Sequence, residues 1–176
     1  MTKNRERKRE IRAIISRMEI FIITGTSGTG KSTICKALQK SHPEFAAHDI
    51  DEDGVPSNPS IEWRRKRTKE LLAKAIKDFE LGKVSVLCGV IVPEEVRSLS
   101  DYDESQNIHY IFLHLDKDVI KERLSERNYS DKEVDDHLNW AEHLEKLVKK
   151  EDNFSTIDVT NKTEVQVLAE VLNRIN

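Results

Sequence analysis

The amino-acid sequence predicts a three-layer α/β/α fold built around a five-stranded parallel sheet. Short apolar runs alternate with amphipathic segments of helical period along most of the chain, which is typical of parallel strands joined by crossover helices. The second observation is a glycine-rich turn that follows the first apolar run and leads into a helical segment. A chain of 176 residues is the size of one such domain.

Five short apolar segments are the predicted strands. The first of them, Glu19–Thr24, is a short apolar run, as expected for a strand that is buried on both faces of the sheet. In chain order they are Glu19–Thr24, Phe45–Ile50, Lys83–Val92, Ile108–Leu115 and Phe154–Val159.

The helices are predicted from apolar spacing and from capping residues. Ser60 is placed to cap a long helix over 61–81, and Ser130 with Glu133 forms a capping box for a helix that ends near Lys150. Pro93 favours a further helix start. The other predicted helices are Lys31–Lys40, one that begins at Asp116, and a C-terminal one that carries Val165, Leu168, Val171 and Leu172.

The composition favours a cytoplasmic protein rather than a membrane or secreted one. No apolar run approaches the roughly 20 residues that a membrane-spanning helix needs, and no secretory signal sequence is visible. The two cysteines, Cys35 and Cys88, lack metal-ligand spacing and fall in segments that face the predicted core. Reduced, buried thiols are typical of the cytoplasm.

The charge is unevenly distributed between an N-terminal arm and the rest of the chain. The net charge is −3, but residues 1–18 contain seven Lys or Arg against two Glu. We therefore separate residues 1–17, a basic arm or extra helix, from a domain over 18–176. The arm suits nucleic acid, although charge runs are usually solvated faces. Met18 is alternatively the natural start of the chain.

The segment Gly25-Thr-Ser-Gly-Thr-Gly-Lys31-Ser32 matches the phosphate-binding loop pattern G-x-x-x-x-G-K-[ST] without a mismatch. Its glycines permit tight turns whose N–H groups point at phosphate oxygens, and the following helix N-terminus adds partial positive charge. Lys31 reaches the β- and γ-phosphates, and the Ser32 hydroxyl joins the shell of Mg²⁺. We expect ATP and Mg²⁺ as cofactors; the nucleotide-binding residues are Gly25, Thr26, Ser27, Gly28, Thr29, Gly30, Lys31, Ser32 and Thr33.

Two further clusters carry the chemistry that separates phosphotransferases from other nucleotide-binding proteins. Asp49 and Asp51 follow the second strand and share one face if the strand continues that far. Such carboxylates hold Mg²⁺ or orient an acceptor hydroxyl, unless they form an acidic surface turn. Arg123 and Arg127 share one helical face and would stabilise charge on a transferring phosphoryl group, unless they are ordinary surface arginines.

The segment from Gly54 to Arg67 is the candidate acceptor-binding region. Trp63 and Arg64 suit stacking on a ring and clamping of an anionic group. Alternatively, Trp63 belongs to the core and Arg64–Arg67 is a solvated basic face.

In their order along the chain these features resemble the nucleotide-kinase-like branch of P-loop kinases, which includes shikimate kinase, gluconate kinase and small antibiotic-modifying phosphotransferases. The resemblance covers nearly everything from Met18 to Asn176. It implies the NMP-kinase-like version of the P-loop nucleoside triphosphate hydrolase fold, with a short lid around 123–133. It also implies that Thr160-Asn161 borders the adenine and that Gly89, at the end of the third strand, borders the acceptor.

The resemblance implies that Asp49 lies near Mg²⁺ and that Asp51 orients or deprotonates the acceptor. The third strand lacks the acidic residue of a standard Walker B motif, so metal positioning falls to Ser32 and Asp49, with the division between Asp49 and Asp51 left open. The triple glycine of shikimate kinase is reduced to Gly89, which argues against shikimate. The guanine-reading Asn-Lys-x-Asp motif of switch GTPases is absent from the sequence.

The sequence therefore predicts ATP-dependent phosphoryl transfer to a small molecule, most plausibly a nucleoside, a nucleotide or a related metabolite. A polynucleotide 5′-hydroxyl kinase is the first alternative, with the basic arm and Arg64–Arg67 holding the strand. A regulatory ATPase without a small acceptor is the second. The oligomeric state cannot be inferred from the sequence.

Overall fold

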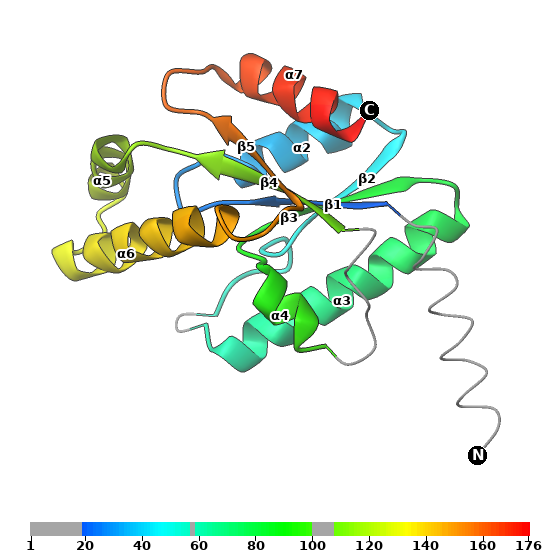
Figure 1. Ribbon diagram of the computed structural model, residues 1–176, viewed down its shortest axis with the longest axis horizontal. Coiled ribbons are helices and arrows are strands. Elements are labelled where there is room, and N and C mark those ends of the chain that lie inside the picture. The colour runs from blue at the N-terminus through cyan, green and yellow to red at the C-terminus, as the bar shows by residue number, and fades with distance from the viewer. Residues whose placement is uncertain (1–18, 57–58, 100–107) are drawn as a thin grey trace.

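A computed structural model describes residues 19–56, 59–99 and 108–176, and these residues form three layers (Figure 1). The strands are β1 (Ile20–Thr24), β2 (Phe45–Asp49), β3 (Val84–Cys88), β4 (Ile108–His114) and β5 (Phe154–Asp158). The helices are α2 (Lys31–Ser41), α3 (Ile61–Glu80), α4 (Pro93–Arg97), α5 (Lys117–Glu126), α6 (Asp131–Val148) and α7 (Glu164–Ile175). The predicted basic arm, residues 1–17, lies outside the described residues.

The five strands form one parallel sheet in the order β2-β3-β1-β4-β5. The central strand β1 pairs with β3 on one side and β4 on the other, so that Ile22 lies between Leu87 and Tyr110. Because all the strands run the same way, their carboxyl ends meet at one edge of the sheet, where ligands of open α/β sheets bind.

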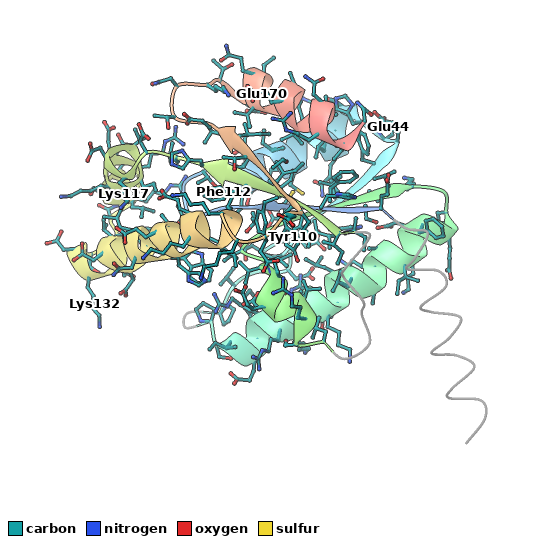
Figure 2. All side chains as sticks on the ribbon, viewed as in Figure 1. Glu44, Tyr110, Phe112, Lys117, Lys132 and Glu170 are labelled. Carbon is teal, nitrogen blue, oxygen red and sulfur yellow. The ribbon has the colours of Figure 1, made fainter. Side chains whose placement is uncertain are left out.

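Alternating side chains of the sheet pack against different helices. Phe21 and Ile23 face a cluster that includes residues of α2, α5 and α7, whereas Ile20 and Ile22 face α3 and α4. Figure 1 shows α2 and α7 on one side of the sheet and α3 and α4 on the other. Figure 2 shows Tyr110 and Phe112 of β4 among the interior side chains and Lys132 at the outer end of α6. The predicted fold class is confirmed.

The third strand is shorter than predicted. β3 ends at Cys88, because Gly89 turns the chain and Pro93 begins α4 four residues later, as its position favoured. Ile91 and Val92 leave the sheet but stay buried. Burial outside the strand is therefore the reason for the longer apolar run.

The second strand ends too early for Asp49 and Asp51 to lie on one face of it. β2 ends at Asp49, and Asp51 lies in the following turn, where its backbone N–H donates to Asp49 Oδ1 at 3.0 Å. The Asp49 carboxylate thus stabilises the turn that ends the strand. The two side chains are brought near each other by this turn and not by strand alternation.

Both cysteines are buried free thiols, as predicted from their apolar surroundings. Within the described ranges, every helix is too short or too polar to cross a membrane.

Candidate active site

The glycine-rich loop connects the central strand β1 to α2 at the carboxyl edge of the sheet. Gly30 is the N-cap of α2 and has a left-handed φ of 92°, which glycine adopts at little cost. A Cβ at Gly25 would lie 2.8 Å from the backbone oxygen of Leu113, so the close approach of β4 requires glycine there. Thr26 and Thr29 are buried, and Thr29 Oγ1 donates to the Thr26 carbonyl at 3.0 Å.

Lys31 begins α2 and folds back across the loop. Its Nζ donates to the carbonyl oxygen of Thr26 at 2.7 Å. Burial lowers the pKa of the Lys31 ammonium to about 8, although the nearby carboxylates of Asp51 and Asp49 act in the opposite direction. A partly buried cation beside the loop amides is suited to binding phosphate, because the negative charge of phosphate offsets the cost of burying the ammonium.

The two predicted arginines lie near the loop, but only one of them is inside a helix. Arg123 lies in α5 and donates from Nη1 to the carbonyl of Gly28 at 2.7 Å. Arg127 is the C-cap of α5, and its charge contributes to the lowered pKa of Lys31. Both cations therefore lie near the place where phosphates would bind. A short connection over 127–130 joins α5 to α6.

Asp49 and Asp51 occupy different positions relative to Lys31. Partial burial, followed by the charge of Asp49, raises the pKa of the Asp51 carboxyl, and Lys31 and Arg67 oppose that rise. Asp51 lines a large cavity, whereas Asp49 is not among its lining residues. The cavity therefore has one of the two carboxylates on its wall.

This cavity has a volume of about 660 Å³, within the range of small-molecule sites. It lies between the loop, the turn after β2, the start of α3 and one face of α6. Its lining residues are Ser27, Lys31, Ile50, Asp51, Val55, Pro56, Pro59, Trp63, Arg64, Val90, Tyr129, Asp136, His137 and Trp140. We call it the acceptor cavity.

The predicted acceptor-binding residues are only partly brought together. Trp63 and Arg64 line the acceptor cavity, from the first turn of α3. Gly89 does not line it: a Cβ at Gly89 would lie 2.8 Å from Cβ of Ile50. Gly89 allows the chain after β3 to pack closely beneath the turn that carries Asp51.

The contribution of α6 to the cavity was not predicted from the sequence. His137 and Trp140 both line the acceptor cavity, and Tyr129 packs edge-on against His137 with ring centroids 5.4 Å apart. Thr26 Oγ1 donates to the His137 carbonyl at 3.3 Å, which ties α6 to the phosphate-binding loop. Burial, and then the charge of Lys31, lowers the pKa of His137. The 3.6-residue period of α6 was visible, but nothing in it indicates which partly exposed positions face a cavity.

A smaller cavity of about 180 Å³ lies on the other side of the loop. Thr33 and Arg123 line it together with Val159 and Lys162, which flank the predicted adenine-contacting pair Thr160-Asn161. Thr160 itself accepts a hydrogen bond from the backbone N–H of Asp116 at 3.1 Å through its Oγ1. The turn after β5 thus borders this cavity through the neighbours of the predicted pair.

Ser32 and Asp49, the predicted magnesium ligands, carry oxygen atoms of the kind that this ion prefers. Ser32 is exposed at the start of α2, next to Lys31, and one oxygen of Asp49 accepts from the Asp51 backbone. Mg²⁺ in nucleotide sites takes one or two protein ligands and fills its shell with phosphate and water oxygens. The donor set therefore fits the ion.

Comparison with known protein families identifies the domain. A family model described as an AAA domain matches residues 21–145, which contain the loop, both aspartates and most of α6. The chain belongs to this family. No match was found among the curated proteins.

Solved structures of a resistance protein and of two kinases share the fold of this AAA-domain protein. A Deinococcus radiodurans tunicamycin resistance protein aligns with a TM-score of 0.60 and 19% identity, over 91% of this chain and 96% of that one. An unliganded sugar kinase from Janibacter sp. HTCC2649 aligns with a TM-score of 0.59 and 18% identity, over 90% of this chain and 94% of that one. A gluconokinase from Sinorhizobium meliloti 1021 aligns with a TM-score of 0.52 and 19% identity, over 89% of this chain and 95% of that one. The predicted resemblance to P-loop kinases is confirmed for the fold.

Proposed function

We propose that the protein is an ATP-dependent phosphotransferase that moves the γ-phosphoryl group to a hydroxyl of a small molecule. The observation that carries the proposal is the position of Lys31. It belongs to the phosphate-binding loop, part of which borders the smaller cavity. It also lines the acceptor cavity, as Asp51 does. A nucleotide and an acceptor bound in the two cavities would thus meet at this lysine.

The residues around Lys31 have the properties that in-line phosphoryl transfer requires. The Lys31 ammonium and the loop N–H groups hold the γ-phosphoryl oxygens, and Arg123 and Arg127 balance charge on the phosphates. Asp51 orients the acceptor hydroxyl and accepts its proton as the new oxygen–phosphorus bond forms and the bond to the β-phosphate oxygen breaks. The products are ADP and the phosphorylated acceptor.

The assignment of the two aspartates follows from the acceptor cavity. Asp51 lines the cavity and is placed to meet an acceptor, whereas Asp49, beside the first turn of α2, is the better partner of Ser32 for Mg²⁺. The ion would supply charge neutralisation between the phosphates.

The test is transfer from γ-labelled ATP to a panel of nucleosides, nucleotides, sugar acids and oligonucleotides. Lys31→Ala should abolish transfer and weaken ATP binding. Asp51→Asn should lower transfer by about 10²–10⁴-fold, the usual contribution of a general base, and leave ATP binding largely intact. Asp135→Asn, an exposed position on α6, is the matched control. Unchanged transfer in the Lys31 and Asp51 variants would reject the proposal.

No specific observation favours the alternatives over a small-molecule acceptor. In the proposed nucleic-acid-binding cluster Arg64 faces Glu95, and Arg67 is paired with Asp53 and Glu70. A polynucleotide kinase would label the oligonucleotides in the panel, with binding that weakens steeply as salt rises. A regulatory ATPase would release phosphate without labelling any acceptor.

A further inference from the structure

The charges on the wall of the acceptor cavity are balanced before an acceptor enters. Among the described residues that line it, the cations are Lys31 and Arg64 and the carboxylates are Asp51 and Asp136. His137 also lines the cavity, and burial followed by the charge of Lys31 lowers its pKa, which favours the neutral ring. Under the proposed function Lys31 is committed to the nucleotide phosphates. Arg64 is then the remaining lining cation that could meet an anionic acceptor.

Arg64 is already paired with a buried carboxylate. Its Nε lies 3.4 Å from Glu95 Oε1 in an ion pair without a hydrogen bond, and the Glu95 side chain is only 10% exposed. The Oε2 atom of Glu95 has no hydrogen-bond partner within the described ranges. Burial raises the pKa of Glu95, and Arg64, then Arg65, opposes that rise. Arg64 is therefore the main cation that makes the buried Glu95 charge tolerable.

An anionic group on the acceptor would meet a guanidinium whose positive charge Glu95 already balances. Drawing the guanidinium away would leave a buried carboxylate without its cation, which is costly in a protein interior. The guanidinium also lies over the ring of Trp140, 5.9 Å from the centroid, so that α3 and α6 both hold it in place. A phosphate or carboxylate on the acceptor is thus disfavoured at this end of the cavity.

The rest of the wall is aromatic and apolar. Both tryptophans of the chain, Trp63 from α3 and Trp140 from α6, line the cavity together with the ring of Tyr129. Val55, Pro56 and Pro59 complete an apolar side contributed by the loop before α3. Flat aromatic surfaces with few free charges favour a ring over a linear, charged molecule.

We infer that the acceptor is an uncharged alcohol that carries a ring, the chemical class of an unphosphorylated nucleoside, and that Glu95 enforces this choice by holding Arg64. The inference narrows the proposed function and rests on it. It disfavours nucleoside monophosphates and sugar acids as acceptors. Glu95 is a positioning residue here, because it acts through Arg64 and does not line the cavity.

Binding is tested separately from transfer by intrinsic tryptophan fluorescence, since both tryptophans line the cavity. Each nucleoside, its 5′-monophosphate and gluconate are titrated into protein saturated with MgADP, which keeps phosphates out of the loop. At least one nucleoside should bind roughly tenfold more tightly than its own monophosphate, because the phosphate of the monophosphate would find no free cation in the cavity. Tighter binding of the monophosphate or of gluconate, or no response to any nucleoside, would overturn the inference.

Transfer measured on the same compounds distinguishes this inference from the proposed function. Saturable nucleoside binding without transfer from ATP would retain the inferred ligand class and reject the phosphotransferase. Transfer to a monophosphate or to gluconate in preference to nucleosides would retain the phosphotransferase and overturn the inference.

The role of Glu95 is tested by Glu95→Gln, which keeps the shape of the side chain and frees Arg64. The ratio of monophosphate to nucleoside affinity should rise by about tenfold, because the competing carboxylate is gone. Glu94→Gln removes the same charge from the exposed neighbour on α4 and should leave the ratio unchanged. The double variant Arg64→Gln/Glu95→Gln removes both charges, and the increase in the ratio of monophosphate to nucleoside affinity should disappear. An unchanged ratio in folded Glu95→Gln would overturn the role of Glu95.

Discussion

Lys31 and His137 come from helices far apart in the sequence, and their charges are linked at the acceptor cavity. Both side chains line the cavity, and the Lys31 ammonium contributes to the lowered pKa of His137. Each group is therefore more easily deprotonated than an ordinary lysine or histidine. This is the pattern expected where a site is built to receive the negative charge of phosphates.

His137 should make the free energy of unfolding depend on pH. Because its pKa is lower in the folded than in the unfolded chain, the unfolded chain binds more protons as pH falls below about 6.5, and stability is lost there. We expect His137→Gln to lose less stability than the natural protein between pH 7.5 and 5.5, measured by urea unfolding. His143→Gln, an exposed position on α6, is the control. An identical pH dependence in both variants would contradict the lowered pKa.

At the scale of elements, the ends of β2 and β3 determine where Asp51 lies. The Ile50 N–H donates to the Cys88 carbonyl at 2.8 Å, and Gly89 packs beneath the Ile50 side chain. This close contact turns the chain away from the sheet after each strand. It places Asp51 on the wall of the acceptor cavity and leaves Asp49 at the strand end.

Gly89→Ala should destabilise the fold through overlap with Ile50. The added Cβ would overlap most closely with Cγ2 of Ile50, an atom that alanine lacks, and overpacking of this kind typically costs about 1–3 kcal/mol. In an Ile50→Ala background the same substitution should cost less, because the overlapping side chain is truncated. Urea unfolding of the four proteins of this cycle provides the measurement, and equal costs in the two backgrounds would refute the close contact.

At the scale of the whole molecule, the strand order puts the phosphate-binding loop at the centre of the sheet. β1 pairs with both β3 and β4. The loop therefore stands between elements that follow β2 and β3, which line the acceptor cavity, and elements that follow β5, which line the smaller one. Parallel strands make this arrangement possible because their carboxyl ends share one edge.

Nucleotide binding should stabilise the whole domain, because the loop joins the central strand to α2. At a concentration 100 times its dissociation constant, MgATP should add about 2.7 kcal/mol to the free energy of unfolding. For a chain of this size that corresponds to a rise of roughly 5–10 °C in Tm. Lys31→Ala should remove most of the rise. Calorimetry or dye-monitored melting would record it, and no rise in the natural protein would contradict nucleotide binding.

Several features were predictable because they depend on residues close together in the sequence. The Gly25–Ser32 loop, the alternation of strands and helices, and the capping box at Ser130 are local patterns with local causes. The strand ends were predicted less well. Buried Ile91 and Val92 extend the apolar run beyond β3, because burial and strand pairing leave the same signal in a sequence.

The sequence by itself determined the fold class and the phosphate-binding loop, because hydrophobic period and glycine spacing act within a few residues. Only the tertiary structure decided that Asp51 and not Asp49 lines the acceptor cavity, that His137 and Trp140 join Trp63 there, and that Glu95 holds Arg64. Those contacts join elements widely separated along the chain. They depend on how each helix is rotated against the sheet, and packing of the whole core determines that rotation.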